Sequence, residues 1–292
     1  MSTPPRDQRK RVTLTTLAEM RALGEPIVMI TAYDHPGALV VEQAGVDIVL
    51  VGDSAANNVL GYSDTVPVTV EELLMLTRAV RRGLKTPLLV GDLPFGSYEA
   101  SDALAIETAH RFVKEAGCDA VKLEGGGASA DRARAVIRAG VPVMGHVGLT
   151  PQTATMLGGY RAQGRTAARA RQVLDDALAL QEAGCFAIVF EAIPAEVTDA
   201  IMPHMEIPVI GIGAGPSADG QVLVLHDLLA IHDDFKPKFA KRFAAVKAEM
   251  LRGVEAYAEE VRTRRFPSAE HTYGIAPEEL ERFRAEITPI RR

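Results

Sequence analysis

The sequence predicts an α/β fold, a single (β/α)8 TIM barrel with an N-terminal helix and a C-terminal helical extension. Apolar runs alternate with amphipathic helical patterns along most of the 292 residues. The runs are continuously apolar, which is typical of parallel strands buried on both faces. Roughly eight strand–helix units within about 250 residues are what a closed barrel requires. An open, doubly wound sheet is the alternative.

The N-terminal segment is expected to be a flexible arm. Residues 1–11, MSTPPRDQRKR, are positively charged, but no apolar stretch follows them, which argues against a secretory signal. An organelle transit peptide stays open as an alternative. Residues 13–24, TLTTLAEMRALG, predict a helix that could close the bottom of the barrel.

The strands and helices follow in alternation. The strands are predicted at 27–34, 47–54, 87–94, 120–125, 142–149, 187–194 and 208–215, with a weaker eighth near 223–229. The clearest helical patterns between them cover 70–83, 101–117 and 168–184.

A short internal echo supports repeated units. EQAGVDIVLVGD, KEAGCDAVKLEG and QEAGCFAIVFEA each place a helix ending in Ala-Gly before a strand that ends in an acid. Gly45, Gly117 and Gly184 therefore occupy the position after a helix, where a residue free to adopt positive φ is favoured.

The C-terminal part, about 236–292, predicts a helix from Lys236 onward and then a short extension that contains proline. No linker is apparent, so residues 1–292 are expected to form one barrel domain with this extension. The fold class and domain organisation are thus those of a single enzyme-sized barrel.

The composition argues against several classes of function. The formal net charge of −6 disfavours nucleic-acid binding. No apolar run reaches the roughly 18 residues of a membrane helix. Cys118 and Cys185 have neither metal-ligand spacing nor a disulfide framework, so we expect buried thiols in a reducing, cytoplasmic compartment.

Acidic residues stand at the ends of five predicted strands. They are Asp34, Asp53, Asp92, Glu124 and Glu191. The carboxyl ends of barrel strands meet at one mouth, where barrel enzymes build their active sites. The alternative is that each acid caps the following helix, and Asp34 fits that alternative best.

Crowded carboxylates repel one another and resist ionisation unless a cation compensates them. Asp and Glu oxygens suit Mg²⁺, and no zinc-type cluster competes. Lys122 lies on the same side of its strand as Glu124, and His146 is placed similarly on the fifth strand, although a core histidine is the alternative there. The pattern predicts cations facing an anionic, oxygen-rich substrate.

Other motifs are weaker. GIGAG at 211–215 lacks dinucleotide-binding spacing, and the sequence contains neither a phosphate-binding P-loop nor a G-x-S-x-G elbow. Residues 149–166 form a long, polar, glycine-rich loop, and such loops are often lids.

The sequence strongly resembles the ketopantoate hydroxymethyltransferase (3-methyl-2-oxobutanoate hydroxymethyltransferase) family. The resemblance extends from about residue 12 to about residue 274 and rests on MITAYD, VGDS, DTVPVTVEEL, GDLPF, VKLEGG, PVMGHVGLTPQ, GGYRAQGR, GIGAG, DGQVLVLHD, KPKFAKRF and EHTY. It implies a barrel of the phosphoenolpyruvate/pyruvate type, a homodecamer, and the first committed step of pantothenate synthesis.

The implied reaction converts 5,10-methylenetetrahydrofolate, 3-methyl-2-oxobutanoate and water into tetrahydrofolate and 2-dehydropantoate. Residue by residue, the resemblance implies three groups of site residues. They are a Mg²⁺ site at Asp53, Asp92 and Glu124, substrate contacts from Asp53, Ser54, Asp92, Lys122 and, with a weaker basis, His146, and a proton acceptor at Glu191. The tail after about residue 274 extends past the family pattern.

We expect Mg²⁺ to polarise the 2-oxo acid, Glu191 to take the C3 proton, and Mg²⁺ with Lys122 to hold the enolate charge. One alternative is another Mg²⁺-dependent 2-oxo acid lyase or mutase of the same barrel type. It would turn over without folate. A second is a catalytically silent barrel, against which the clustered charges argue.

Overall fold

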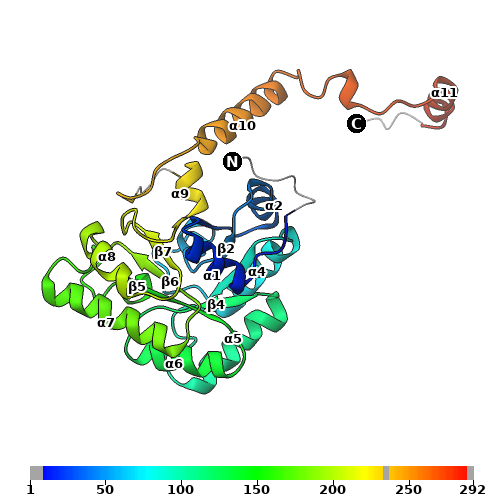
Figure 1. Cartoon of the computed structure of the whole chain (residues 1–292). Coiled ribbons are helices and arrows are strands. Elements are labelled where there is room, and N and C mark those ends of the chain that lie inside the picture. Colours follow the sequence, from blue (N-terminus) through cyan, green and yellow to red (C-terminus); the bar gives the residue numbers. More distant parts are fainter. Residues whose placement is uncertain (1–8, 233–236, 288–292) are drawn as a thin grey trace. The chain divides into compact units, whose positions relative to one another are not determined.

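The computed structural model describes residues 9–232 and 237–287. Its eight parallel strands close into a barrel in chain order (Figure 1), which confirms the predicted fold class. The strands are β1 (Ile27–Thr31), β2 (Ile48–Val51), β3 (Leu88–Asp92), β4 (Ala120–Lys122), β5 (Val143–Gly148), β6 (Ala187–Glu191), β7 (Val209–Ile212) and β8 (Gly220–Leu223).

Helices follow the strands around the outside. In the barrel unit they are α1 (Leu14–Leu23), α2 (His35–Ala44), α3 (Ala55–Asn58), α4 (Val70–Gly83), α5 (Asp102–Ala116), α6 (Ala128–Arg138), α7 (Ala167–Ala183), α8 (Ala195–Ile201) and α9 (Leu225–Leu229). A Thr69–Glu72 capping box begins α4 where the sequence predicts its start. Gly45, Gly117 and Gly184 end α2, α5 and α7 at φ of 81°, 74° and 100°, as predicted.

Alternate strand residues fill the barrel. Met29, Ile48, Val90 and Met144 belong to one buried cluster inside it, whereas the outward-facing strand residues pack under the helices. Leu17 of α1 is buried in the interior cluster. The backbone N–H of Val12 also donates to the Thr86 carbonyl, just before β3. Helix α1 therefore closes the amino end of the barrel, as the sequence suggested.

The weak eighth strand was misplaced by the sequence prediction. The structure has β8 at Gly220–Leu223 and helix α9 at Leu225–Leu229, where the sequence predicted a strand near 223–229. Gly220 pairs with Ile27, and a Cβ there would lie 2.4 Å from the Ile27 carbonyl oxygen, so glycine is required by close packing. Gln221 breaks the apolar run, and the spacing of the leucines after it is helical.

The C-terminal helix begins later than predicted. Lys236 lies outside the described residues, and α10 spans Val246–Arg262. Phe239 packs against the barrel-interior cluster and Ala240 is buried. Because these contacts hold the chain in an irregular conformation, the apolar spacing before Val246 is not used for a helix.

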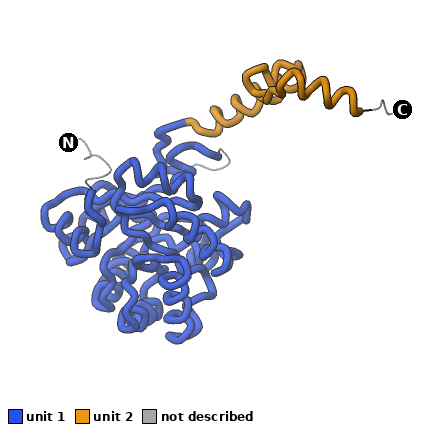
Figure 2. The backbone as a smooth tube through the Cα atoms, turned by 90° about the vertical axis from the view of Figure 1, so that its right-hand side faces the viewer, with its two compact units in different colours: residues 1–244 blue, residues 245–292 orange. Residues whose placement is uncertain are grey.

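The chain divides into two compact units, residues 1–244 and 245–292, coloured separately in Figure 2. Unit 1 holds the barrel. Unit 2 contains α10, a 3-10 turn (η4, Ala269–His271) and α11 (Pro277–Glu286). Whether this is one domain with an extension, as the sequence predicts, stays a prediction.

Of the predicted N-terminal arm, residues 1–8 lie outside the described residues. Arg9 forms an ion pair with Glu42 and Arg11 forms one with Asp119, so both contact the barrel. Among the described helices, none is both long enough and apolar enough to span a membrane.

Candidate active site

Strand alternation carries polar side chains to the mouth of the barrel. Val90, Met144 and Val189 lie in the interior cluster, and two residues further along their strands stand Asp92, His146 and Glu191. Successive side chains on one face of a strand are two residues apart. The same alternation leads along β4 from Ala120 to Lys122 and then to Glu124, just beyond the strand. These polar groups therefore form the carboxyl-end layer of the barrel interior.

Lys122 lies at the centre of this layer. It is 3% exposed. Its Nζ is 2.8 Å from Asp92 Oδ1 and 3.8 Å from Glu124 Oε1. Burial lowers the pKa of Lys122, but the carboxylates of Asp92, Glu124 and Asp53 outweigh it and raise the pKa above its ordinary value. The ammonium is therefore fully charged in the core of the mouth.

His146 bridges two acids. Its Nδ1 is 3.2 Å from Glu124 Oε1 and its Nε2 is 3.2 Å from Glu191 Oε2. Burial and the nearby Lys122 lower the pKa of His146, but Glu124 and Glu191 outweigh them and raise it to about 9. At neutral pH the ring is thus an imidazolium, so Nδ1 donates to Glu124 and its 3.4 Å contact with Lys122 Nζ is not a hydrogen bond.

The carboxylates differ in their pKa shifts. Burial, then Asp92 and Glu124, raise the pKa of Asp53 well above its ordinary value. Burial also raises the pKa of Asp92, which Lys122 offsets only in part. Burial alone would raise the pKa of Glu124, but His146 and Lys122 lower it. Without a further cation, the Asp53–Asp92 side of the mouth is the electrostatically unfavourable side.

Asp53 and Ser54 follow β2. The backbone N–H of Asp53 donates to Asp92 Oδ2 at 3.0 Å, which joins the ends of β2 and β3. The Ser54 hydroxyl lies 2.8 Å from the hydroxyl of Tyr33, a residue just beyond the end of β1. Both residues therefore belong to the same mouth as Asp92.

Asp34 is the one strand-end acid outside this network. Its Oδ1 accepts from the backbone N–H of Gly37 at 2.7 Å and so caps α2. The alternative interpretation of the sequence, a helix cap, is correct for this residue.

Two buried polar residues were not predicted from the sequence, Gln152 and Tyr98. The Gln152 amide Nε2 donates to Asp53 Oδ2 at 3.1 Å, and its backbone N–H donates to Glu124 Oε2 at 3.0 Å. Tyr98 OH donates to Gln152 Oε1 at 2.7 Å. The signal available was a glutamine next to a proline at the start of the 149–166 loop, which by itself indicates no partner.

That loop is only partly regular. A 3-10 turn (η2, Pro151–Thr153) begins it, and the backbone N–H of Gln163 donates to the Ala192 carbonyl, close to Glu191. Met156 and Tyr160, between these two attachments, are exposed. The role of a lid stays a prediction.

The donor set of the mouth suits a hard cation. Asp53, Asp92 and Glu124 offer carboxylate oxygens only. Within the described residues Asp92 Oδ1 accepts no well-aligned hydrogen bond, although it lies 2.8 Å from the Lys122 ammonium. In the same part of the chain, no three His, Cys, Asp or Glu side chains already converge as a complete ligand group. A cation here would therefore take few protein ligands and would need water or substrate oxygens as well.

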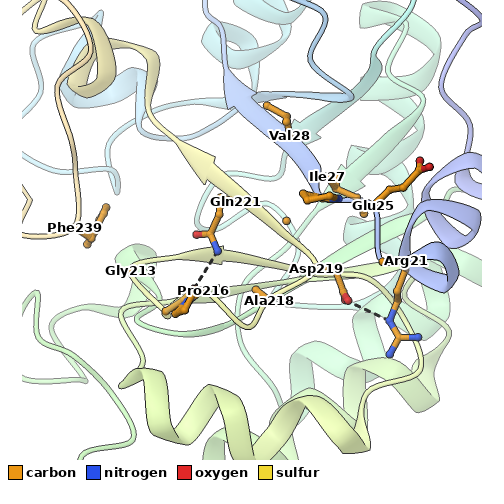
Figure 3. Close-up of a pocket in the computed structure, with 14 residues that line it drawn as sticks. Arg21, Glu25, Ile27, Val28, Gly213, Pro216, Ala218, Asp219, Gln221 and Phe239 are labelled. Atoms are coloured by element: carbon orange, nitrogen blue, oxygen red, sulfur yellow. Dashed lines mark hydrogen bonds and ion pairs between the residues drawn. The ribbon is translucent and has the colours of Figure 1, made fainter. Parts of the chain in front are cut away.

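A cavity of about 800 Å³ lies elsewhere, beside β1 and β8 (Figure 3). Figure 3 shows Arg21 beside Asp219, and Gln221 donating to the Gly215 carbonyl at 3.0 Å. Within the part of the chain that the structure describes, its lining includes none of the predicted site residues. Two of its lining residues, Val28 of β1 and Gln221 of β8, are paired neighbours in the sheet and face outward from the barrel. The cavity is therefore separate from the mouth.

Solved barrel enzymes share the fold of this chain at low sequence identity. Phosphonopyruvate hydrolase, crystallised with oxalate and Mg²⁺, matches at a TM-score of 0.60 and 15% identity, over 94% of this chain and 97% of that one. A 2,3-dimethylmalate lyase of the PEP mutase/isocitrate lyase superfamily matches at a TM-score of 0.57 and 16% identity, over 92% and 93%. These likenesses show the class of the fold, a closed (β/α)8 barrel.

Sequence comparison defines the particular family. The sequence model of ketopantoate hydroxymethyltransferase matches residues 11–269, and the chain belongs to that family. The 3-methyl-2-oxobutanoate hydroxymethyltransferase of Moorella thermoacetica is 51% identical over 266 residues, 91% of this chain and 99% of the relative. The mitochondrial enzyme 1 of Arabidopsis thaliana is 49% identical over 98% of this chain and 84% of the relative. The protein is accordingly an enzyme, a hydroxymethyltransferase that makes ketopantoate.

Proposed function

We propose that the chain transfers a hydroxymethyl group from 5,10-methylenetetrahydrofolate to 3-methyl-2-oxobutanoate through an enolate. Family membership supports the acceptor, and it is the sole support for the folate donor. The observation that supports the chemistry is the buried Lys122 ammonium, 2.8 Å from Asp92 within the cluster of acids at the mouth. A small 2-oxo acid needs such a cation where charge develops on its oxygen.

We place one Mg²⁺ at Asp53, Asp92 and Glu124. The fit rests on the all-oxygen donor set and on the raised pKa values of Asp53 and Asp92, which a bound cation would reverse. When bound, the cation would polarise the 2-oxo group and favour loss of the C3 proton. Oxygens of the 2-oxo acid would add to the few ligands that the protein supplies to the cation.

The chain's own residues hold the substrate. Lys122 presents its ammonium to the developing enolate oxygen. The Ser54 hydroxyl donates to the substrate carboxylate. The Tyr33 hydroxyl, 2.8 Å away, donates to the Ser54 oxygen and so fixes its orientation. Both groups are preorganised by buried partners, so little reorganisation accompanies the reaction.

Glu191 takes the C3 proton. It stands at the end of β6, and Glu124, Lys122 and Asp92 are already engaged with one another across the mouth. His146 Nε2 lies 3.2 Å from Glu191 Oε2, an ion-pair distance without a well-aligned hydrogen bond. The enolate carbon then bonds to the one-carbon unit of the folate, and water completes the hydroxymethyl group as tetrahydrofolate leaves. His146 also contacts the substrate in this proposal.

An assay of 2-dehydropantoate formation tests this function. We expect product only when 3-methyl-2-oxobutanoate, 5,10-methylenetetrahydrofolate and Mg²⁺ are all present, and loss of product on chelation. Turnover of the 2-oxo acid without folate would favour the alternative, a lyase or mutase of the same superfamily. Turnover undiminished by a chelator would contradict the metal assignment.

A homodecamer and a cytoplasmic location, both expected from the sequence, stay predictions. The named plant relative is mitochondrial, whereas the other relative described is bacterial.

A further inference from the structure

We propose that Gln152, with Tyr98 behind it, is a positioning residue that orients the Asp53 and Glu124 carboxylates for the divalent cation. The inference rests on the proposed function, because it assigns a second layer to the proposed cation site. It concerns a residue that touches two of the three proposed ligands and is itself 4% exposed.

The orientation of the Gln152 amide is fixed by its partners. Nε2 lies 3.0 Å from the Leu93 carbonyl, a group that can only accept a hydrogen bond. The NH₂ group must therefore face Leu93, and its second proton points to Asp53 Oδ2 at 3.1 Å. The amide oxygen is left facing Tyr98. No flipped amide satisfies all these contacts.

Tyr98 has two acceptors in reach, Gln152 Oε1 at 2.7 Å and the Glu124 carbonyl at 3.4 Å, and the shorter contact is the stronger one. Its hydroxyl therefore donates to Gln152 Oε1, an oxygen that can only accept. The same hydroxyl oxygen lies 3.3 Å from the backbone N–H of Glu124, which donates to it. Gln152 returns to Glu124 through its own backbone N–H, 3.0 Å from Oε2. Glu124 is thus held at both its backbone and its carboxylate by one pair of residues.

This network leaves each carboxylate one oxygen that Gln152 does not engage. Gln152 donors take Asp53 Oδ2 and Glu124 Oε2. Glu124 Oε1 is turned towards Lys122 and His146. A neutral amide suits this task because it supplies donors without adding another charge to the mouth. Partners behind metal ligands fix the orientation of those ligands and commonly tune affinity by about 10–100-fold.

The Gln152→Met variant tests the inference. Methionine fills a similar volume, keeps the backbone N–H and removes the three side-chain hydrogen bonds, to Asp53, Leu93 and Tyr98. We expect the Mg²⁺ dissociation constant, measured by titration calorimetry on the full chain, to rise by about 10-fold or more. The matched control is Gln181→Met. Gln181 accepts from the Glu206 backbone N–H at 2.7 Å but lies on α7, away from the mouth. The Mg²⁺ dissociation constant of the Gln181→Met variant should stay within about two-fold of the wild-type value.

Tyr98→Phe keeps the test open if Gln152→Met folds poorly. It removes one oxygen, leaves the fold's packing intact, and should also raise the Mg²⁺ dissociation constant, by less than Gln152→Met. Because both residues act through one network, the double variant should be less affected than the product of the two single effects predicts.

The possible results distinguish a failure of the positioning role from a failure of the proposed function. If the wild type binds Mg²⁺ and both variants match it within about two-fold, the positioning role is wrong and the proposed function stands. If the unfolding temperature falls but Mg²⁺ affinity does not, Gln152 is structural only, which also overturns the inference. If the wild type itself binds no Mg²⁺, Mn²⁺ or Co²⁺, the metal assignment fails, and the positioning role fails with it.

Discussion

At the scale of single residues, charge compensation explains the mouth. Lys122 and His146 are buried cations in contact range, a repulsive pair that stands only because Asp92, Glu124 and Glu191 surround it. Removing the cations would leave the carboxylates buried and unpaired, and removing the carboxylates would do the same to the cations. Such a change is far more costly than the net stabilisation that the intact pairs provide.

Lys122→Met should therefore destabilise the metal-free protein. Loss of the ammonium leaves Asp92 without its 2.8 Å partner. We expect the free energy of unfolding at neutral pH to fall by about 3–5 kcal/mol, measured by urea denaturation. The control, Lys114→Met on the exposed surface of α5, should change it by less than about 0.5 kcal/mol. Equal effects of the two substitutions would contradict this account.

The sequence predicted which charged side chains meet at the mouth of the barrel. The strand-end acids, Lys122 and His146 could be found because a barrel brings strand ends together and alternation assigns each side chain a face. Gln152 and Tyr98 could not be found, since their contacts join positions 99 and 54 residues apart in the chain. Asp34 is the opposite case, a strand-end acid whose partner is local, and its sequence context favours the helix cap that the structure shows.

At the scale of elements, helices α4, α5 and α7 were predicted well, whereas the last strand and the start of the C-terminal helix were not. Helices α4, α5 and α7 each begin with a side-chain N-cap, so the local sequence is enough to predict where they start. Strand β8 is defined by pairing with β1 and β7, and it contains Gly220 and the exposed Gln221. Nothing in so short and polar a segment signals a strand without those neighbours.

Gly148 controls how β5 meets β6. It has φ of 94°, and a Cβ would lie 2.3 Å from the Glu191 carbonyl oxygen. Gly148→Ala should therefore displace the end of β6, which carries Glu191. We expect turnover to fall by about 100-fold, since misplacing a reacting group by about 1 Å has that effect. An active variant with wild-type turnover would show that this end of β6 tolerates movement.

Glu42 joins α2 to the start of β3 and predicts a pH effect on stability. Its carboxylate accepts from the backbone N–H groups of Lys85 at 2.8 Å and Thr86 at 3.1 Å. Burial raises the pKa of Glu42, but these hydrogen bonds, with Arg9, lower it below its ordinary value of 4.5. A lowered pKa contributes stability that is present above the unfolded-state value and is lost as pH falls through the folded-state value.

Glu42→Gln should accordingly lower the free energy of unfolding by about 1.5–3 kcal/mol at pH 7, by urea denaturation. The difference from the wild type should shrink as the pH falls below 4.5, the ordinary value for this carboxyl. The exposed Glu182→Gln serves as a control. A difference for Glu42→Gln that does not change with pH would refute the charged role of this carboxylate.

At the scale of the whole molecule, each unit exposes apolar surface. In unit 1, Val28 on the outer face of β1 is 49% exposed. In unit 2, α10 exposes Met250, Leu251, Val254 and Tyr257 along its length. A contiguous apolar surface, such as the row on α10, is typical of protein–protein contacts, whereas Val28 alone carries no such signal. The row on α10 supports the homo-oligomer expected from the sequence.

Light scattering coupled to size exclusion measures that assembly. We expect a single species of about ten times the mass of one chain, and a Val254→Glu variant of smaller mass because a charge would enter the proposed contact. A wild-type mass equal to that of one chain would exclude an oligomer. A discrete assembly of another size would correct the expected number of subunits.

Exchange of the C3 proton of 3-methyl-2-oxobutanoate in deuterated water tests the central claim most directly. We predict exchange, followed by NMR, that requires Mg²⁺ and occurs without 5,10-methylenetetrahydrofolate. The Glu191→Gln variant should bind Mg²⁺ as the wild type does and show no exchange. Exchange retained by that variant would remove Glu191 as the base. No exchange by the wild type, with Mg²⁺ and with or without tetrahydrofolate, would contradict an enolate-forming site.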